Sequence, residues 1–465
     1  MAFKRVDAED LAFFERIMPG RAHSGAAIST DHMHDEMTEY GSFAPDAVLL
    51  AETAEEICSV LRYCNEREIP VTPRGAGTGL CGGCVAIHGG VVLSSERMKR
   101  VLEVDARNMT ATLEPGVLLM EFPKSLEGTG LFYPPDPGEK TATMGGNVMT
   151  NAGGMRAVRY GVTRDYVLGM DVALADGTLL TLGGKNVKTS SGYSLLDLMI
   201  GSEGTLGIVT KLTVKLVPEP RANVSLLLPF DDLDACIDAV PEILACGCEP
   251  TAVEFMEREV IACAERYLGK QFPDHSSDAY LLVRLDGASA QALEPAMETL
   301  TDTALRLGAR DVLLADTDER KESIWNARGA FLEAIKSGTP SMDECDVVVP
   351  RDKIADFVRA SREISRDCGV RILSFGHAGD GNLHIYALMD DLPPETWANA
   401  RQAVMDALYR QAALLGGQVS GEHGIGHAKA GYLRESAGNT AIELMRGIKA
   451  VFDPRGILNP GKVIG

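Results

Sequence analysis

Apolar positions recur at helical spacing over residues 7–18, and Pro19-Gly20 end the pattern, which predicts a short N-terminal helix. From residue 46 to 72 three patterns follow one another. AVLLAE predicts a buried strand, residues 54–67 an amphipathic helix, and IPVT a second strand. The residues on the apolar face of the predicted helix are Ala54, Ile57, Leu61 and Cys64. This strand–helix–strand order predicts an α/β opening of the fold.

Short strands separated by Gly-rich turns continue as far as Pro218-Glu219-Pro220. We therefore predict a first domain over residues 1–220, which includes the N-terminal helix.

Residues 221–415 form a second predicted domain, in which longer helices alternate with strands. The predicted strands are VSLLLPF, TAVEF, AYLLVRL, VRILSF and LHIYAL, and the predicted helices are 231–246, 288–308, 317–337 and 351–368. This order fits an antiparallel sheet with helices on one face, so the fold class is α+β. A C-terminal segment, residues 416–465, ends in VFDPRGILNPGKVIG, which predicts an irregular tail that packs on another part of the chain.

The charge balance argues against one class of partner. The 465 residues include 45 Lys and Arg against 66 Asp and Glu, a formal charge of −21, which repels polyphosphate, so we expect no nucleic-acid partner. No stretch has the roughly 18–20 uncharged apolar residues that a membrane helix needs. The start, MAFKRVDAEDLAFF, becomes acidic where a signal peptide would turn apolar. We expect a cytoplasmic protein without a transmembrane segment, which could still reach a membrane surface through a partner.

The ten cysteines do not form a disulfide framework. The close pairs Cys81/Cys84 and Cys246/Cys248 each lack the second pair that a zinc or iron–sulfur site requires. We expect reduced thiols and no cluster.

The first glycine-rich loop is PRGAGTGLCGG, from Pro73 to Gly83. It contains a G-x-G-x-x-G match, but a Rossmann site needs a helix directly afterwards, and here VAIHGGVVLS predicts a strand. A run of exposed backbone N–H groups beside Arg74 and Thr78 would still suit a diphosphate. Taken alone, the motif is equally compatible with an ordinary turn-rich loop.

Two further loops change that balance: MGGNVMTNAGGMRAVRYG (144–161) and IGSEGTLGIVT (200–210) lie in the same predicted domain. Together the three loops resemble the flavin-binding domain of the vanillyl-alcohol oxidase/p-cresol methylhydroxylase family, over roughly residues 40–220. The resemblance implies that the first loop binds the FAD pyrophosphate. It implies that the second lines the isoalloxazine and ribityl, through Gly145, Gly146, Asn147, Asn151, Gly153 and Gly154. It further implies that Glu203, Gly204 and Ile208 lie on the adenosine side.

The attachment of FAD also follows from the resemblance. Covalent members of the family carry a His close to the position of Thr78, so the resemblance implies a non-covalent FAD, with Cys81 as the nearest alternative attachment point. The full set of residues assigned to FAD is Pro73, Arg74, Gly75, Ala76, Gly77, Thr78, Gly79, Gly82, Pro137, Thr141, Gly145, Gly146, Asn147, Asn151, Gly153, Gly154, Glu203, Gly204, Ile208 and Asn459.

Four of the nine histidines lie near the C-terminal end of the chain. In FGHAGDGNLHIY, His377 ends one predicted strand, a turn follows, and His384 begins the next, so both imidazoles can face one point. VSGEHGIGH adds Glu422 and His423. Two His and one carboxylate form a ligand set for Zn²⁺, Mn²⁺ or Fe²⁺ that leaves coordination positions open. A polar hydrogen-bonded cluster without metal is the alternative.

The adjacent Glu422 and His423 suggest a division of roles. His423 and His427 are spaced as in a zinc protease, but Gly424 and Gly426 break the helix that such a site needs. One member of the adjacent pair can bind metal while the other acts as a base. We assign Glu422, with His377 and His384, to the metal and His423 to proton abstraction.

GHAGDGNLH, GEHGIG and the closing ILNPGKV extend the resemblance over nearly the whole chain and narrow it to the FAD-linked 2-hydroxyacid dehydrogenases. This group includes the glycolate oxidase flavin subunit and D-lactate dehydrogenases. In it, Asn459 matches a residue near the flavin, and Arg328 of IWNARGAFLEAI matches the arginine that binds the substrate carboxylate. The planar fork of an arginine suits a carboxylate. With Asn382 of the predicted turn, His423 and Arg328 complete our set of catalytic residues.

The expected reaction oxidises a D-2-hydroxy acid to the 2-keto acid. The metal lowers the pKa of the α-hydroxyl, His423 takes the proton, and the Cα hydride passes to flavin N5. Acidic Asp343, Glu344 and Asp346 would repel a second carboxylate, which favours D-lactate or glycolate over 2-hydroxyglutarate.

Electrons must then leave through a separate acceptor, which is an electron-transferring flavoprotein, an iron–sulfur subunit or a quinone. The sequence leaves the choice of acceptor open, and it also leaves open a homo-oligomer. Two alternative functions remain: a flavin oxidoreductase of another substrate, similar to alkyl-glycerone-phosphate synthase, and a flavin electron-transfer subunit.

Overall fold

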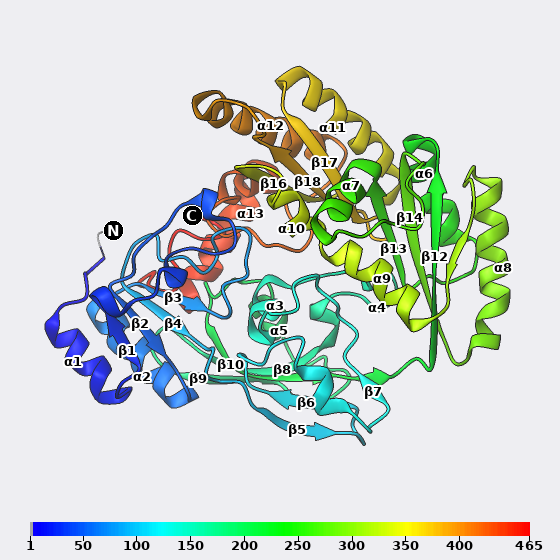
Figure 1. The fold of residues 1–465 in the computed structure, drawn as a ribbon. Coiled ribbons are helices and arrows are strands. Elements are labelled where there is room, and N and C mark those ends of the chain that lie inside the picture. Colours follow the sequence, from blue (N-terminus) through cyan, green and yellow to red (C-terminus); the bar gives the residue numbers. More distant parts are fainter. Residues whose placement is uncertain (1–2) are drawn as a thin grey trace. The chain divides into compact units, whose positions relative to one another are not determined.

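The computed structural model describes residues 3–465, and the chain divides into two compact units (Figure 1). The first unit consists of the chain up to Ala152, Val162–Glu219 and Glu422–Gly465. The second consists of Gly153–Gly161 and Pro220–Gly421. Each unit is therefore assembled from stretches that are separated in the sequence.

The short helix α4 (Ala157–Tyr160) explains why Gly153–Gly161 groups with the second unit, although we predicted it within the first domain. Arg159 Nη1 donates to the carbonyl oxygens of Glu249 and Asp286 at 3.3 and 3.1 Å. The Tyr160 hydroxyl donates to the Asp286 carboxylate at 3.3 Å. A glycine-rich loop has no apolar periodicity, so the sequence alone could not show which sheet this segment contacts.

One sheet of the first unit has the order β1-β2-β4-β3, with β2, β3 and β4 parallel and β1 antiparallel to β2. The elements around it are α1 (Ala8–Ile17), β1 (Ala22–Ser24), β2 (Ala47–Leu50), α2 (Ala54–Arg67), β3 (Val71–Arg74) and β4 (Val91–Ser94). Thr53 caps α2, because its hydroxyl accepts the N–H of Glu56. Of the predicted apolar face of α2, Ile57, Leu61 and Cys64 are buried in the core that includes this sheet, which confirms the helix and both flanking strands.

The other large sheet of the first unit is antiparallel, with the order β5-β6-β10-β8-β9. Its strands are β5 (Val101–Asp105), β6 (Thr110–Leu113), β8 (Val167–Ala173), β9 (Leu179–Gly183) and β10 (Ile208–Lys215). The smaller elements of the unit are β7 (Leu131–Phe132), α3 (Met144–Thr150), α5 (Leu195–Met199) and β11 (Val217–Pro218).

The last long helix, α13 (Ala430–Phe452), was not predicted. Of its residues only Ala430 and Ile442 are buried, and it is kinked at Gly438, so it lacks a clear apolar stripe. After α13 the irregular tail that we predicted is present, and Leu458 forms a parallel bridge with Val71 of β3.

The second unit contains a seven-stranded antiparallel sheet with the order β15-β12-β14-β13-β17-β18-β16, which confirms the antiparallel prediction. Its strands are β12 (Ala222–Phe230), β13 (Ala252–Glu257), β14 (Ala279–Gly287), β15 (Leu313–Ala315), β16 (Met342–Val348), β17 (Arg371–His377) and β18 (Asn382–Leu388). We missed β16 because Asp343, Glu344 and Asp346 are buried acids, and an apolar pattern does not detect them.

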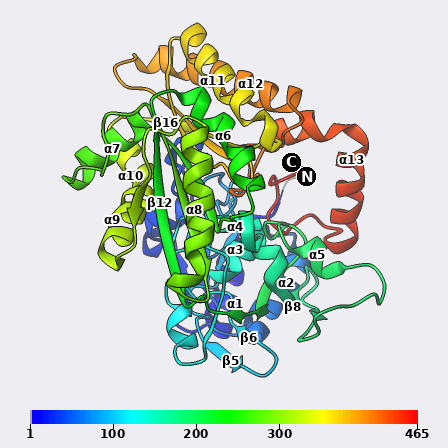
Figure 2. The same cartoon turned by 90° about the vertical axis from the view of Figure 1, so that its right-hand side faces the viewer.

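Helices cover both faces of this sheet, so the prediction of helices on one face was incomplete. Arg328 of α9 binds Glu254, whereas Arg362 of α11 lies 3.9 Å from Glu257 on the same strand. Because residues three apart in a strand point to opposite faces, α9 and α11 lie on opposite sides (Figure 2). The helices are α6 (Leu233–Ala245), α7 (Arg258–Leu268), α8 (Ala290–Arg306), α9 (Asp318–Gly329), α10 (Phe331–Lys336), α11 (Ile354–Cys368) and α12 (Pro394–Leu414). The single helix predicted over 317–337 is therefore two helices, broken at Ala330.

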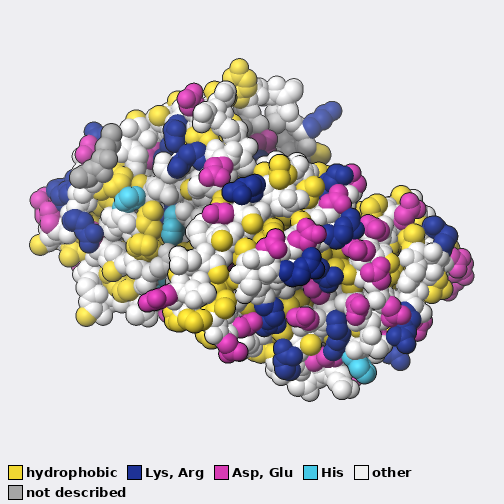
Figure 3. Space-filling view, turned by 90° about the horizontal axis from the view of Figure 1, so that it is seen from above, with side chains coloured by type: hydrophobic (Ala, Val, Ile, Leu, Met, Phe, Trp, Pro, Cys, Tyr) yellow, Lys and Arg dark blue, Asp and Glu magenta, His cyan; other side chains and the backbone are white. Residues whose placement is uncertain are grey.

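The surface agrees with the charge balance of the sequence. On the face that Figure 3 shows, Lys and Arg side chains are interspersed with Asp and Glu and do not gather into one basic patch. Within residues 3–465, no helix combines the length and apolar character needed to cross a bilayer.

Candidate active site

A hairpin of the second unit brings His377 and His384 together. His384 pairs with Phe375, two residues before His377, so both imidazoles lie on the same face of the sheet. Their ring centroids are 5.1 Å apart, with the rings nearly perpendicular. In the turn between them, Gly381 has φ +90°, and a Cβ there would collide with the Val349 carbonyl oxygen. The hairpin therefore requires glycine at this position.

The neighbouring strand β13 supplies a residue that we did not predict, Glu254, whose side chain is fully buried. Its carboxylate oxygens lie 2.9 and 3.0 Å from His377 Nδ1. Arg328 Nε donates to Oε2 at 2.8 Å, and Arg328 Nη2 lies 2.6 Å from the same oxygen. Burial raises the pKa of Glu254, but His377 and Arg328 outweigh burial and hold that pKa below its ordinary value. The carboxylate is thus an ionised bridge between the two predicted site residues.

Arg328 is positioned inside the protein rather than on a solvated helix face. Only 6% of the residue is exposed, and its guanidinium carbon lies 4.6 Å from the centroid of the Phe375 ring. Glu254 thus engages the Nε and Nη2 edge of the guanidinium fork.

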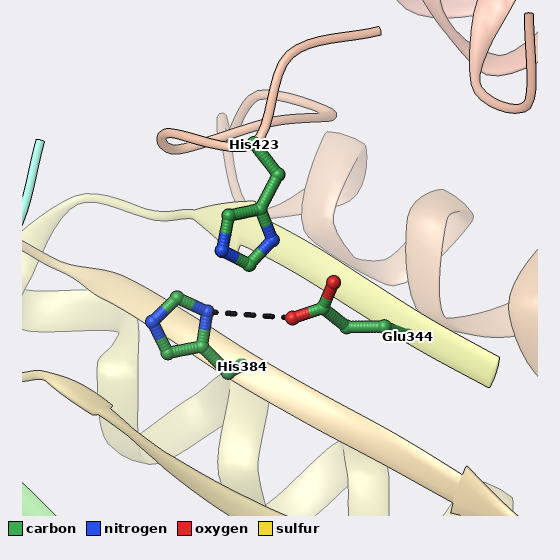
Figure 4. A group of neighbouring side chains, drawn as sticks. All are labelled: Glu344, His384 and His423. Carbon is green, nitrogen blue, oxygen red and sulfur yellow. Dashed lines mark ion pairs between the residues drawn. The ribbon is translucent and has the colours of Figure 1, made fainter. Parts of the chain in front are cut away.

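Strand β16 places two more buried carboxylates on the same sheet face, Glu344 and Asp346. His384 Nδ1 lies 3.7 Å from an oxygen of Glu344 (Figure 4) and 3.7 Å from an oxygen of Asp346. The Tyr386 hydroxyl donates to Glu344 at 2.8 Å. Asp343, which we expected to act with them, points to the other face and lies 3.6 Å from Arg401 Nε. A charged residue inside an otherwise apolar strand, such as Glu254 in TAVEFME, is the sequence signal that could have revealed these carboxylates.

Asn382 is held by the protein itself. Its Nδ2 donates to Asp346 Oδ1 at 2.7 Å and to the Val347 carbonyl oxygen at 2.8 Å. The other oxygen of Asp346 accepts the Ser420 hydroxyl at 2.8 Å and the Gly421 N–H at 3.1 Å. Asn382 and Asp346 thus fix the backbone immediately before Glu422-His423.

Glu422 and His423 directly follow Gly421 in the chain. Because consecutive Cα atoms are about 3.8 Å apart, the position of Gly421 limits where the Cα atoms of both residues can lie. His423 Nε2 lies 3.7 Å from Glu422 Oε1. Both side chains are partly exposed.

In the first unit, the first glycine loop follows β3, and its arginine points inward. Arg74 Nη1 donates to the His34 carbonyl at 2.9 Å, and Nη2 donates to the Asp31 carbonyl at 2.6 Å. A Cβ on Gly77, which has φ +84°, would collide with this guanidinium. Arg74 therefore holds the loop in its conformation. The backbone N–H groups of the loop come from Gly75, Ala76, Gly77, Thr78 and Gly79.

The second loop contains α3, which Thr143 caps through the N–H of Gly146. Gly145 packs so closely that a Cβ would lie 2.6 Å from Pro115. Asn151 adopts φ +52° at the helix end, and its Oδ1 accepts the Arg164 N–H. The buried Nδ2 of Asn147 has no hydrogen-bond partner among the described residues. Gly153 and Gly154 begin the stretch that groups with the second unit, and nearby Pro137 and Thr141 lie in the turn before α3.

Glu203 of the third loop binds the chain itself, where we had assigned it to the adenosine. Its buried carboxylate accepts the N–H groups of Ile425 and Gly426 at 2.7 and 2.8 Å. Burial raises the pKa of Glu203, and these N–H groups oppose that rise. Gly204 with φ +71° packs on Pro73, and Ile208 is buried in β10.

Asn459 closes the same region from the end of the chain. Its Nδ2 donates to the carbonyl oxygens of Gly83 and Glu203 at 2.8 and 2.7 Å, which ties the first loop to the third. The Asn459 Oδ1 is buried without a hydrogen-bond partner in the described chain. With the Asn147 amide, it is a buried polar atom that a bound polar ligand could satisfy.

Comparison with known proteins identifies that ligand. A model of the FAD binding domain matches residues 45–183, and a model of the C-terminal domain of FAD linked oxidases matches residues 219–463. The chain belongs to the FAD-linked oxidases. It is thus an FAD-linked oxidoreductase, and the predictions of an enzyme and of FAD are confirmed. The glycine loops and the two unsatisfied amides fit this cofactor.

Relatives of this FAD-linked oxidase agree over nearly its full length. A D-lactate dehydrogenase of Anaerostipes hadrus is 48% identical over 99% of this chain and 98% of its own. The glycolate oxidase subunit GlcD of Bacillus subtilis is 40% identical over 93% of this chain and 91% of its own. A D-lactate dehydrogenase of Archaeoglobus fulgidus is 40% identical over 90% of this chain and 91% of its own.

Solved structures confirm the fold prediction. A p-cresol methylhydroxylase with substrate bound superposes with a TM-score of 0.81 at 18% identity, over 98% of this oxidase and 96% of that chain. The 4-ethylphenol oxidase from Gulosibacter chungangensis gives a TM-score of 0.80 at 21% identity, over 100% of this oxidase and 98% of that chain.

Proposed function

We propose that this FAD-linked oxidase dehydrogenates a D-2-hydroxy acid of the D-lactate or glycolate class to the 2-keto acid. The observation that carries the proposal is the buried guanidinium of Arg328 on the sheet face that also bears two imidazoles. The names of the D-lactate dehydrogenase and glycolate oxidase relatives support the same substrate class.

The proposed metal ligands are His377, His384 and Glu422, with Zn²⁺, Mn²⁺ or Fe²⁺ as the ion. Two sets of possible metal ligands share His384. One set is His377, His384 and Glu422, and the other is Glu344, His384 and His423. Imidazole and carboxylate donors of this kind suit all three ions. When bound, the metal supplies a Lewis acid that polarises the substrate oxygen atoms.

The side chains would then share the remaining work. Arg328 would bind the substrate carboxylate through Nη1, and His423 would take the hydroxyl proton. Asn382 would act as a positioning residue, because the protein already uses both of its Nδ2 donors. Bound FAD supplies the two-electron acceptor.

The substrate preference would follow from charge. Glu254, Glu344 and Asp346 are buried on the sheet face that holds one arginine. This excess of carboxylates disfavours a second substrate carboxylate, which supports a monocarboxylate such as D-lactate or glycolate.

Electron transfer to a separate acceptor is part of the proposal, since the matched domains account for one flavin. The acceptor would be an electron-transferring flavoprotein, an iron–sulfur subunit or a quinone.

Anaerobic reduction of the flavin by a panel of D- and L-2-hydroxy acids tests the reaction. D-lactate or glycolate should bleach the flavin absorbance, and chelator treatment should slow bleaching until Zn²⁺, Mn²⁺ or Fe²⁺ is restored. Reduction by none of the acids would overturn the proposal and leave a flavin enzyme of another substrate or an electron-transfer subunit. Full activity without metal would overturn the metal role.

Two histidine variants test the roles. His384→Ala should lose metal, whereas His423→Ala should keep FAD and metal and lose about 10²–10⁴-fold in single-turnover flavin reduction. His275→Ala is a matched control, because His275 is exposed in a loop of the second unit. If His423→Ala loses the metal while Glu422→Gln retains it, the ligand and the base are exchanged.

A further inference from the structure

We propose that Glu254 is a positioning residue that holds the substrate-binding arginine and a metal-binding histidine with one carboxylate. The inference rests on the proposed function of Arg328 and His377 and adds a third residue to it. Its consequence is that one side-chain change should weaken metal binding and substrate binding together.

The sheet explains why Glu254 can reach both partners. Strands β13 and β17 are antiparallel neighbours, with Met256 opposite Phe375 and Phe255 opposite Gly376. One further step of this register sets Glu254 opposite His377. Helix α9 covers the same face and brings Arg328 to the carboxylate from the other side.

Toward His377, the carboxylate selects the tautomer. An ionised carboxylate only accepts hydrogen bonds, so at 2.9 and 3.0 Å it requires the proton on Nδ1. The lone pair is then on Nε2, the nitrogen that would bind a metal. Carboxylates that hold metal-binding histidines in this way fix the ring orientation and make it a stronger ligand.

Toward Arg328, the same carboxylate fixes the plane of the guanidinium. Contacts from Nε and Nη2 hold one edge of the fork, and the Phe375 ring lies 4.6 Å from its central carbon. A guanidinium held on two sides presents Nη1 in a single orientation, which lowers the entropy lost when a carboxylate binds.

Glu254→Gln tests the proposal, because an amide keeps the shape of the side chain but removes its charge and replaces one acceptor oxygen with an NH₂ donor. Zn²⁺ affinity, measured by calorimetry on the FAD-loaded, metal-stripped protein, should fall by about 10–100-fold. At saturating Zn²⁺, the KM for D-lactate in anaerobic flavin reduction should rise by about tenfold or more. Glu257→Gln is a matched control, since Glu257 is on the same strand but faces the opposite side and accepts the Ser374 hydroxyl.

The outcomes are distinct. A shift in metal affinity alone, in KM alone, or in neither would overturn the joint role of Glu254, and equal shifts in Glu257→Gln would do the same. If wild-type protein neither binds Zn²⁺ nor is reduced by D-lactate, the proposed function itself fails.

Should Glu254→Gln not fold, Glu254→Asp keeps the charge but shortens the reach by one methylene. It should then lengthen the contacts with both His377 and Arg328, so the Zn²⁺ affinity and the KM for D-lactate should both shift relative to the wild type. Unchanged constants in Glu254→Asp would then contradict the inference.

Discussion

Replacing Gly421 with alanine tests how the backbone before Glu422-His423 is held. A Cβ on Gly421 would lie 2.8 Å from Asn382 Oδ1 and still closer to its Nδ2. Asn382 is 5% exposed and makes two hydrogen bonds through Nδ2, so it cannot swing aside without breaking them. The substitution should therefore separate Asn382 from Asp346.

The cost can be worked from the two lost bonds. A hydrogen bond to a charged group contributes about 1.5–3 kcal/mol, and one to a neutral carbonyl contributes about 0.5–1.5 kcal/mol. Loss of the bonds to Asp346 and to the Val347 carbonyl should therefore destabilise the second unit by about 2–4.5 kcal/mol. Because the strained residue directly precedes Glu422, single-turnover flavin reduction should also slow.

Tryptophan fluorescence is the assay of choice, because both tryptophans, Trp325 and Trp397, lie in the second unit and report its unfolding in urea. Gly329→Ala in α9 of the same unit is the control, since a Cβ there meets nothing within 4 Å and alanine favours a helix. Our reasoning is wrong if the free energy of unfolding of Gly421→Ala lies within about 0.5 kcal/mol of that of the control and its single-turnover rate is normal. The close approach to Asn382 would then not affect stability.

Three further predictions concern the first unit. Gly426→Ala should destabilise this unit by about 2 kcal/mol more than the control Gly438→Ala. Both glycines have positive φ, but only at Gly426 would a Cβ collide with a carbonyl oxygen, that of Cys81, which accepts two backbone N–H groups. Equal urea midpoints of the two variants would contradict this. Burial lowers the pKa of His427 to about 4 from 6.5, so the free energy of unfolding is independent of this group above pH 6.5 and decreases as the pH drops from 6.5 to 4. In His427→Gln, the free energy of unfolding measured in urea should depend less on pH between pH 4 and 6.5. The same pH dependence as in the wild type would refute this prediction. Acid precipitation should release all the FAD, and a yellow pellet would show covalent attachment.

The sequence was most informative where function and local pattern coincide. The turn between His377 and His384 could be predicted because glycines and two strand patterns lie within one short segment. The glycine loops could be found for the same reason. The contacts of Glu254 and Glu344 with the histidines could not be predicted, because each carboxylate reaches a histidine only through pairing of strands that are far apart in the chain. Glu344 itself was expected near the substrate, but only as a charge that repels a second carboxylate.

The roles of Arg74, Glu203 and Asn459 show a second limit. Each was assigned to FAD from its place in a motif, which stays a prediction, and each also hydrogen-bonds backbone groups of a remote segment, which the motif did not reveal. A motif shows which residue type a position requires. It does not show whether that residue contacts the ligand or holds the loop that does.

The tie between Asn459 and the first glycine loop has a consequence for the order in which the protein is made. The ribosome releases the glycines at 75–83 early, then the whole of the second unit, and only afterwards the segment from Glu422 onward. Until that segment emerges, Glu203 lacks its two N–H donors and Val71 lacks its bridge to Leu458. The loops that fit FAD are therefore complete only when the end of the chain has been made, and we expect cofactor uptake to be one of the last steps of maturation.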